Sequence, residues 1–212
     1  MSAGPVIGVI DYGMGNRRSV EKALARVGAR PIVSSDVDEL RGADGLVLPG
    51  VGAFPRAIEN LRRLGLDELI AERVGAGVPL LGVCLGLELL FEESDEQGGA
   101  AGLGLLPGRV GSLRSGRSLK LPHIGWNLVS LHRRSELTAG LPAQCAFYHV
   151  HSFVARPADD QDVLGTSEYG EEFASVVARD TLFGVQFHPE KSSTHGLALL
   201  RNFSGVCARV AA

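Results

Sequence analysis

The first half of the chain alternates short apolar runs with segments of helical periodicity, and this alternation limits the folds that it can adopt. Residues 5–11, 31–33 and 45–48 have the length and composition of buried strands. Residues 19–27, 55–64 and 67–74 instead carry apolar side chains at the spacing of one helical face. Strands that alternate with helices form parallel sheets covered by helices, and ligands bind at the carboxyl ends of such strands.

The second half of the chain has a different pattern. Strands separated by turns are predicted at residues 110–113, 127–131, 145–154, 163–167, 173–178 and 182–187. A closing helix is predicted over residues 194–210, and no segment has the composition of a linker between domains. We therefore expect one α/β domain over residues 1–212, with a mixed, mostly parallel central sheet flanked by helices and an antiparallel extension in the second half.

Composition excludes several classes of function. The 21 lysine and arginine residues are balanced by 24 aspartate and glutamate residues, and no basic run marks a nucleic-acid surface. No apolar stretch approaches the length of a membrane span, and the first residues lack the charged region of a secretory signal. The odd set of three cysteines fits a reducing compartment better than a disulfide framework. We expect a cytoplasmic protein without a nucleic-acid or membrane partner.

Cys84 lies between an apolar run at residues 78–81 and a predicted helix over residues 85–91. Gly82 and Gly86 flank it at a spacing that permits a tight turn from strand to helix, as in a nucleophile elbow. Such a turn presents the sulfur at the edge of the sheet, and the first amides of the helix are expected to lower the pKa of the thiol. Taken alone, Cys84 also fits a buried core position. The flanking glycines favour catalysis.

His188 and Glu190 follow another apolar run and are separated by Pro189. Proline disfavours helical backbone at His188, so the imidazole and the carboxylate can lie on the same side of an extended segment. Glu190 can then accept a hydrogen bond from one ring nitrogen while the other faces a thiol. The two segments together predict a nucleophile, its base and the group that orients the base.

The turn at residues 49–52 is the second expected part of the site. Its glycines allow backbone to approach a ligand, and the amides of Val51 or Gly52 can join that of Leu85 as oxyanion donors. An ordinary turn is the alternative. The segment has no lysine and no phosphate-loop spacing, so nucleotide binding is not supported.

The remaining histidines give weaker signals. His149 and His151 share one face of a predicted strand, which is compatible with a metal pair, but no third ligand accompanies them at a suitable spacing. His123, His132 and His195 belong to no constellation, and surface or capping roles are expected. We therefore predict no metal and no cofactor.

Six blocks of sequence resemble the class I glutamine amidotransferases, and most closely the glutaminase subunits of imidazole glycerol phosphate synthase. They are DYGMGN at 11–16, PGVGAFP at 49–55, GVCLG at 82–86, GWN at 125–127, YHVHS at 148–152 and QFHPEKS at 186–192. The cysteine and His-Pro-Glu blocks are common to the class, whereas DYGMGN, GWN and the residues after Glu190 are more specific to the subunit. The resemblance implies a flavodoxin-like core and spans nearly the whole chain.

The resemblance also implies a mechanism. Cys84 is expected to attack the side-chain amide of L-glutamine, His188 to shuttle protons and Glu190 to orient His188, without a cofactor. Gly52, His151 and Ser152 correspond to the family's glutamine site. The class usually has glutamine where this chain has Glu88, and an ionised carboxylate can accept but not donate hydrogen bonds. We expect Glu88 to bind the substrate with altered contacts.

A partner is expected on chemical grounds, because ammonia released into water near neutral pH is protonated and loses its nucleophilicity. The resemblance identifies this partner as the (β/α)8-barrel cyclase subunit of imidazole glycerol phosphate synthase, acting in histidine biosynthesis. It suggests Asn16, Trp126, Tyr148 and Lys191 as interface residues. For Trp126, packing in the core is the alternative reading.

Three other functions remain open at this stage. The chain can be a class I glutaminase that serves anthranilate, guanylate or aminodeoxychorismate synthesis. It can be a cysteine peptidase or an esterase-like hydrolase that acts without glutamine and without a partner. It can also be a regulatory domain that keeps the fold without catalysis, which alkylation of Cys84 by a glutamine analogue would exclude.

Overall fold

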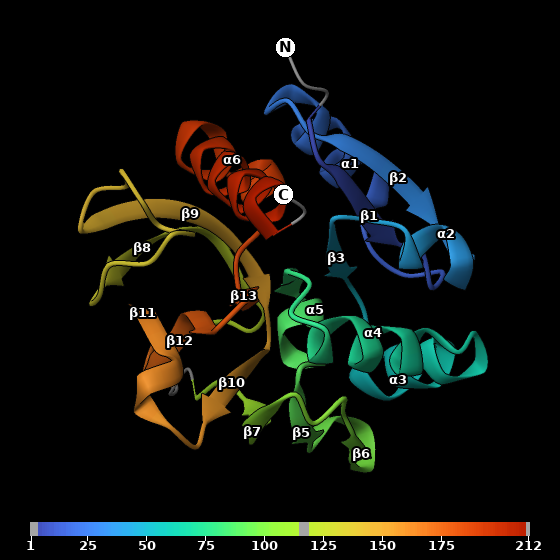
Figure 1. Cartoon of the computed structure of the whole chain (residues 1–212). Helices are drawn as coiled ribbons and strands as arrows, with labels where there is room; N and C mark the ends of the chain where they lie inside the picture. The colour runs from blue at the N-terminus through green and yellow to red at the C-terminus, as the bar shows by residue number, and fades with distance from the viewer. Residues whose placement is uncertain (1–3, 115–118, 211–212) are drawn as a thin grey trace.

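The structure, a computed structural model, describes residues 4–114 and 119–210 and is built around a nine-stranded mixed sheet (Figure 1). The strand order is β2-β1-β3-β4-β13-β12-β11-β8-β9. The first five strands in this order run parallel to one another, and the remaining four pair antiparallel. In chain order these strands are β1 (Val6–Ile10), β2 (Arg30–Ser34), β3 (Gly45–Gly50), β4 (Leu80–Cys84), β8 (His123–Leu131), β9 (Gln144–His151), β11 (Val163–Glu168), β12 (Glu172–Arg179) and β13 (Leu182–Val185). The mixed α/β architecture predicted from the sequence is confirmed.

Helices cover both faces of the parallel part of the sheet. They are α1 (Arg17–Arg26), α2 (Val37–Arg41), α3 (Phe54–Arg63), α4 (Leu66–Gly75), α5 (Leu85–Glu88) and α6 (Ser193–Val210). One apolar core packs α1 and α6 against one face through residues such as Leu24 and Phe203. A second core packs α3, α4 and α5 against the opposite face through residues such as Ile58 and Leu69 (Figure 1).

A second, four-stranded sheet has the order β10-β7-β5-β6. Its strands are β5 (Phe91–Ser94), β6 (Ala100–Ala101), β7 (Leu106–Ser112) and β10 (Phe153–Pro157). Short 3₁₀ turns lie at η1 (Glu96–Gly98), η2 (Asp160–Asp162) and η3 (Pro189–Lys191). No helix in the described parts of the chain is long and apolar enough to cross a membrane.

This second sheet corrects two sequence predictions. The helix predicted over residues 85–91 ends at Glu88, because the carbonyl of Leu90 accepts from the amides of Leu105 and Leu106 and the chain continues as β5. The strand predicted over residues 145–154 is two strands, since β9 pairs with β8 in the main sheet and β10 pairs with β7 in the other. An apolar run alone does not distinguish these outcomes, which depend on distant pairing partners.

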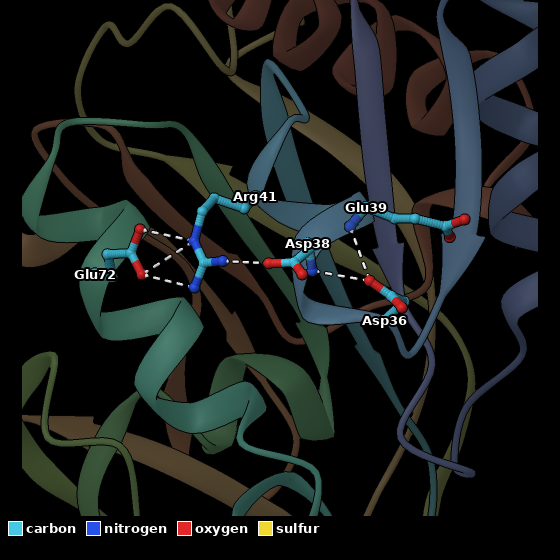
Figure 2. A network of polar contacts seen from close by, with 5 residues as sticks. All are labelled: Asp36, Asp38, Glu39, Arg41 and Glu72. Carbon is cyan, nitrogen blue, oxygen red and sulfur yellow. Dashed lines mark hydrogen bonds and ion pairs between the residues drawn. The ribbon is translucent and has the colours of Figure 1, made fainter.

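The short helix α2 was not predicted from the sequence, and its start is fixed by Asp36. One carboxylate oxygen of Asp36 accepts from the amides of Asp38 and Glu39, at 2.8 and 3.0 Å (Figure 2). At the other end, the guanidinium of Arg41 pairs with Asp38 and with Glu72 of α4 (Figure 2). A five-residue helix has few internal hydrogen bonds, so its stability depends on these contacts.

Replacement of Asp36 by alanine is expected to lower the free energy of unfolding by about 1 kcal/mol, because two amides at the start of α2 lose their acceptor. Urea denaturation measures the change. Asp36→Asn is the matched control, since its amide oxygen still accepts from both groups. Equal loss in the two variants would contradict a capping role.

Candidate active site

Cys84 ends β4 and begins α5 in a strained backbone conformation. Its φ and ψ are 56° and −113°, in a region that residues with a side chain rarely adopt. A Cβ atom at Gly86 would lie 1.8 Å from the carbonyl oxygen of Leu48, and one at Gly82 would lie 2.6 Å from the carbonyl oxygen of Gly86. Only glycine therefore fits on either side of the turn. The structure has the strand-to-helix elbow that the glycine spacing predicts.

His188 and Glu190 lie after β13, which is the parallel neighbour of β4. His188 Nδ1 is 3.0 Å from Glu190 Oε1, and the two side chains are 3% and 1% exposed. Glu190 Oε2 is buried without a hydrogen-bond partner among the described residues. The imidazole is thus oriented through one nitrogen by a desolvated carboxylate, which leaves Nε2 for proton transfer.

Strand β9 connects the imidazole segment to the thiol. The amide of His188 donates to the carbonyl oxygen of Tyr148 at 2.9 Å, and Cys84 Sγ lies 3.5 Å from the carbonyl oxygen of Val150. The two acceptors are two residues apart on one strand, which corresponds to about 7 Å. The edge of β9 therefore contacts both the His188 segment and the Cys84 thiol, and so holds them close to each other.

A cavity of about 240 Å³ adjoins the thiol. Its walls come from the loop after β3, from the elbow and from the end of β9, and the lining residues include Val51, Gly52, Cys84, Leu85, Glu88, His151 and Ser152. All seven residues were predicted for the nucleophile, the oxyanion donors or the substrate site. A larger cavity of about 790 Å³ lies at residues 131–143 and is lined by none of the predicted site residues.

The loop that follows β3 is adjacent to the elbow because Gly50 pairs with Cys84 in the sheet. A Cβ atom at Gly50 would lie within 3 Å of Leu85, Gly86 and the hydroxyl of Tyr12. Gly52 has a φ of 117°, which favours glycine. Close packing at Gly50 and the conformation of Gly52 place the Val51–Gly52 backbone at the cavity, where its amides can serve an oxyanion.

Burial raises the pKa of the Cys84 thiol well above its ordinary value, and the charge of Glu88 acts in the same direction. The amide of Leu85 lowers the pKa, as the sequence predicted, but its effect is smaller than that of desolvation. The predicted effect of the amide is therefore present, but burial outweighs it and the net shift is upward. A protonated thiol needs a nearby base to become a nucleophile.

Glu88 is buried in the cavity wall, and its Oε1 accepts from the Nε2 amide of Gln186 at 2.9 Å. Burial raises the pKa of Glu88 to about 8, and the nearby carboxylate of Glu96 contributes. The side chain is thus largely neutral near pH 7. A neutral carboxyl group keeps one O–H donor, so it resembles the glutamine side chain that is usual at this position in the class.

Replacement of Glu88 by glutamine is expected to raise the melting temperature by several degrees at alkaline pH. The pKa of the folded state lies above the ordinary 4.5, so the folded protein binds more protons than the unfolded chain between these values. The free energy of unfolding therefore falls as pH rises from about 5 to 8, and Glu88→Gln removes this contribution.

The measurement is the melting temperature of both proteins across this pH range, with the exposed Glu93→Gln as a control. The difference between Glu88→Gln and the wild type should shrink toward pH 5. A difference that does not change with pH would contradict a raised pKa at Glu88.

Glu96 is a cavity residue that the sequence did not reveal. It lies in η1, lines the cavity, and accepts from the amide of Phe54 at the start of α3, at 2.8 Å. No motif marks this carboxylate, because it reaches the cavity only after the chain turns at the end of α5. Its position adds a negative charge beside Glu88.

The predicted interface residues lie around the β8–β9 hairpin and the ends of other elements. Trp126 is 56% exposed and packs edge-on against Tyr148, with ring centroids 6.1 Å apart, so the alternative of core packing is wrong. Lys191 is exposed directly after Glu190, and Asn16 is half-buried before α1.

The sequence missed two neighbours of Trp126 on the same face of β8, Ile124 and Leu128, which are 60% and 55% exposed. We call Ile124, Trp126 and Leu128 the β8 face.

The histidines form an arrangement that differs from the prediction. His149 and His151 are both buried on one face of β9, as their spacing indicated. His123, for which a surface or capping role was expected, is also buried, and its Nδ1 lies 3.0 Å from His151 Nε2. In residues 4–114 and 119–210, no group of three or more His, Cys, Asp or Glu side chains is arranged to hold a metal ion.

Comparisons with known proteins agree on the family. The family description "Glutamine amidotransferase class-I" matches residues 8–205. The chain is 53% identical over 197 residues to the imidazole glycerol phosphate synthase subunit HisH of Moorella thermoacetica, with 93% of each protein covered. It is 49% identical over 205 residues to the HisH subunit of Geobacillus thermodenitrificans, with 95% of this chain and 96% of that protein covered.

Solved structures show the same fold at lower identity. A crystal structure of a glutamine amidotransferase superposes with a TM-score of 0.73 at 23% identity, covering 95% of this chain and 98% of the other. The family match spans most of the chain, and identities near 50% extend over nearly its full length. The chain belongs to the class-I glutamine amidotransferase family and, within it, to the HisH subunits of imidazole glycerol phosphate synthase.

Proposed function

We propose that this chain hydrolyses L-glutamine to glutamate and ammonia through Cys84, as the glutaminase subunit of imidazole glycerol phosphate synthase in histidine biosynthesis. The observation that carries the proposal is the elbow at Cys84, which opens on a small cavity while β9 holds the His188 segment beside it. A cysteine thiol with a histidine base beside it suits attack on an amide carbon.

In the proposed reaction, His188 removes the proton of Cys84 and the thiolate attacks the side-chain amide carbon of glutamine. The C–N bond breaks as His188 returns the proton to the leaving nitrogen, and ammonia departs. Water, deprotonated by His188, then hydrolyses the γ-glutamyl thioester to glutamate and regenerates the thiol. Glu190 orients the imidazole and stabilises its charged form.

The backbone of the cavity supplies the donors for the two tetrahedral intermediates in this proposal. The amide of Leu85 already interacts with the Cys84 sulfur, and the Val51–Gly52 backbone lines the same cavity. Loss of one oxyanion donor typically lowers the rate by a factor of about 10²–10³. We assign substrate contacts to Gly52, Glu88, His151 and Ser152 because all four line this cavity.

The released ammonia needs an acceptor enzyme, and we propose that this is the (β/α)8-barrel cyclase subunit. The β8 face is a row of three exposed apolar side chains, as is typical of an interface core. In the sheet, Ile124 pairs with Val150, which lines the cavity, so docking on this face places the partner beside the reaction. Asn16, Trp126, Tyr148 and Lys191 are assigned to this interface.

The decisive experiment measures glutamate release with and without the cyclase subunit and its nucleotide ligand. Stimulation by the partner, together with labelling of Cys84 by a glutamine-analogue electrophile, is expected. Trp126→Ala and Lys191→Ala should weaken complex formation and ammonia transfer. Cleavage of peptides or esters without any glutaminase activity would instead support the hydrolase reading.

The single domain over residues 1–212 and the cytoplasmic location stay predictions. The location is supported by the three cysteines, which are all buried free thiols, because free thiols are typical of reducing compartments.

A further inference from the structure

Three buried histidines lie together between β8, β9 and β12, and two of them have no part in the mechanism above. The ring centroid of His123 is 5.1 Å from that of His149 and 5.0 Å from that of His151. Tyr169 stacks on His123 at 4.1 Å. Buried imidazoles in contact are costly unless their nitrogens are paired, so the hydrogen-bond directions within this cluster are informative.

The tautomer of His151 follows from its partners. Its Nδ1 is 3.0 Å from the carbonyl oxygen of Phe153, which can only accept, so Nδ1 carries a hydrogen. Burial lowers the pKa of His151 to about 3, so the ring is neutral and Nε2 is an acceptor. The group facing Nε2 is His123 Nδ1, which must therefore donate.

The same reasoning applies to His149. Its Nδ1 donates to the carbonyl oxygen of Phe147 at 3.1 Å, and burial lowers its pKa to about 3. Its Nε2 is therefore an acceptor, and it lies 3.3 Å from the hydroxyl oxygen of Ser175. The tautomers of His149 and His151 are thus determined by their carbonyl partners.

These bonds fix the segment of β9 that positions the reacting groups. His149 and His151 bind carbonyl groups at residues 147 and 153, and so bracket the acceptors for His188 and Cys84 at Tyr148 and Val150. The side chain of His149 is also anchored to β12 through Ser175. Among the side chains of the described residues, only that of His123 forms a hydrogen bond with His151.

We propose that His123 is a positioning residue for glutamine hydrolysis: its Nδ1–H holds His151, and through it the Val150–Ser152 wall of the cavity, in the arrangement that Cys84 requires. The inference rests on the proposed function, because the position of this wall matters only if the cavity is the site of glutamine hydrolysis. His123 does not line the cavity, so its effect is transmitted by the His151 ring.

Two substitutions separate the hydrogen bond from the packing of the ring. In His123→Asn, the side-chain amide nitrogen stands at the same number of bonds from the backbone as Nδ1 and can donate to His151. In His123→Phe, a flat ring remains to stack on Tyr169 and His149, but the donor is lost. A purely structural role of the ring predicts that phenylalanine is the better substitute, whereas the positioning role predicts asparagine.

The experiment measures kcat and KM for glutamate release by the complex with its partner subunit, well below the melting temperature of every variant. We expect kcat to fall about tenfold or more in His123→Phe, since small displacements near a reacting centre have effects of this size. His123→Asn should retain most of the wild-type kcat. The control is His132→Phe, at an exposed histidine directly after β8, and it should match the wild type.

Equal kcat values in wild type and His123→Phe would overturn the inference, and so would a larger loss in His123→Asn than in His123→Phe. The rate of Cys84 alkylation by iodoacetamide is measured in parallel and needs no glutamine turnover. If the wild type released no glutamate, the proposed function would fail. A slower alkylation of His123→Phe than of His123→Asn would still support positioning by His123.

Discussion

Replacement of Cys84 by alanine is expected to abolish glutamate release, with kcat lowered by a factor on the order of 10⁴ or more. The sulfur is the only nucleophile proposed for the reaction, and its removal leaves the cavity and the oxyanion donors without an attacking atom. Cys84→Ser is expected to be nearly as inactive. A hydroxyl is harder to deprotonate than a thiol, and the buried site already raises the pKa of the group at this position.

The matched control is Cys145→Ala, which removes the same atoms from a buried cysteine of β9 that does not line the cavity. It should retain glutamate release at temperatures where it is folded. Binding of the partner should also survive in Cys84→Ala, because the thiol is buried and is not part of the β8 face. Substantial glutamate release by Cys84→Ala would contradict a covalent mechanism at this residue.

The sequence predicted those parts of the site that local chemistry determines. The elbow needs glycine at positions 82 and 86, because backbone atoms occupy the space where a side chain at either position would lie. The motif itself therefore specifies the geometry of the turn. The pair His188–Glu190 is likewise local, because the two side chains meet across one short turn. Glu190 lies in the 3₁₀ turn η3, so the extended segment predicted for the pair is correct only at His188. The alternation of strands and helices in the first half is also a local pattern, and it specified a parallel sheet.

The features that the sequence missed depend on contacts between distant segments. Glu96 reaches the cavity only because the helix after Cys84 ends after one turn and the chain joins a second sheet. His123 meets His151 only through the register of β8 against β9, which no single segment encodes. The net rise in the pKa of Cys84 was also missed, because desolvation by the whole core exceeds the lowering by the local amide that the sequence did predict.

Replacement of Glu190 by glutamine is expected to lower kcat by a factor of about 10²–10⁴ while KM for glutamine changes little. The carboxylate accepts from His188 Nδ1, which leaves Nε2 without a hydrogen and able to act as a base. A glutamine amide can turn its NH₂ group toward Nδ1 and so favour the opposite tautomer, in which Nε2 carries the hydrogen. The charge that would stabilise the imidazolium is also lost.

The kinetic pattern distinguishes this role from a role in binding. Glu190 does not line the cavity, so loss of its carboxylate should affect the proton transfers rather than the affinity for glutamine. Labelling of Cys84 by a glutamine analogue should slow in parallel with kcat, because the thiolate forms less readily without an oriented base. The exposed Glu136→Gln, which loses only a surface pair with Arg209, should behave as wild type. A Glu190→Gln enzyme with unchanged kcat would show that the imidazole is oriented by its backbone tether to Tyr148 alone, and the carboxylate would then have no part in the chemistry.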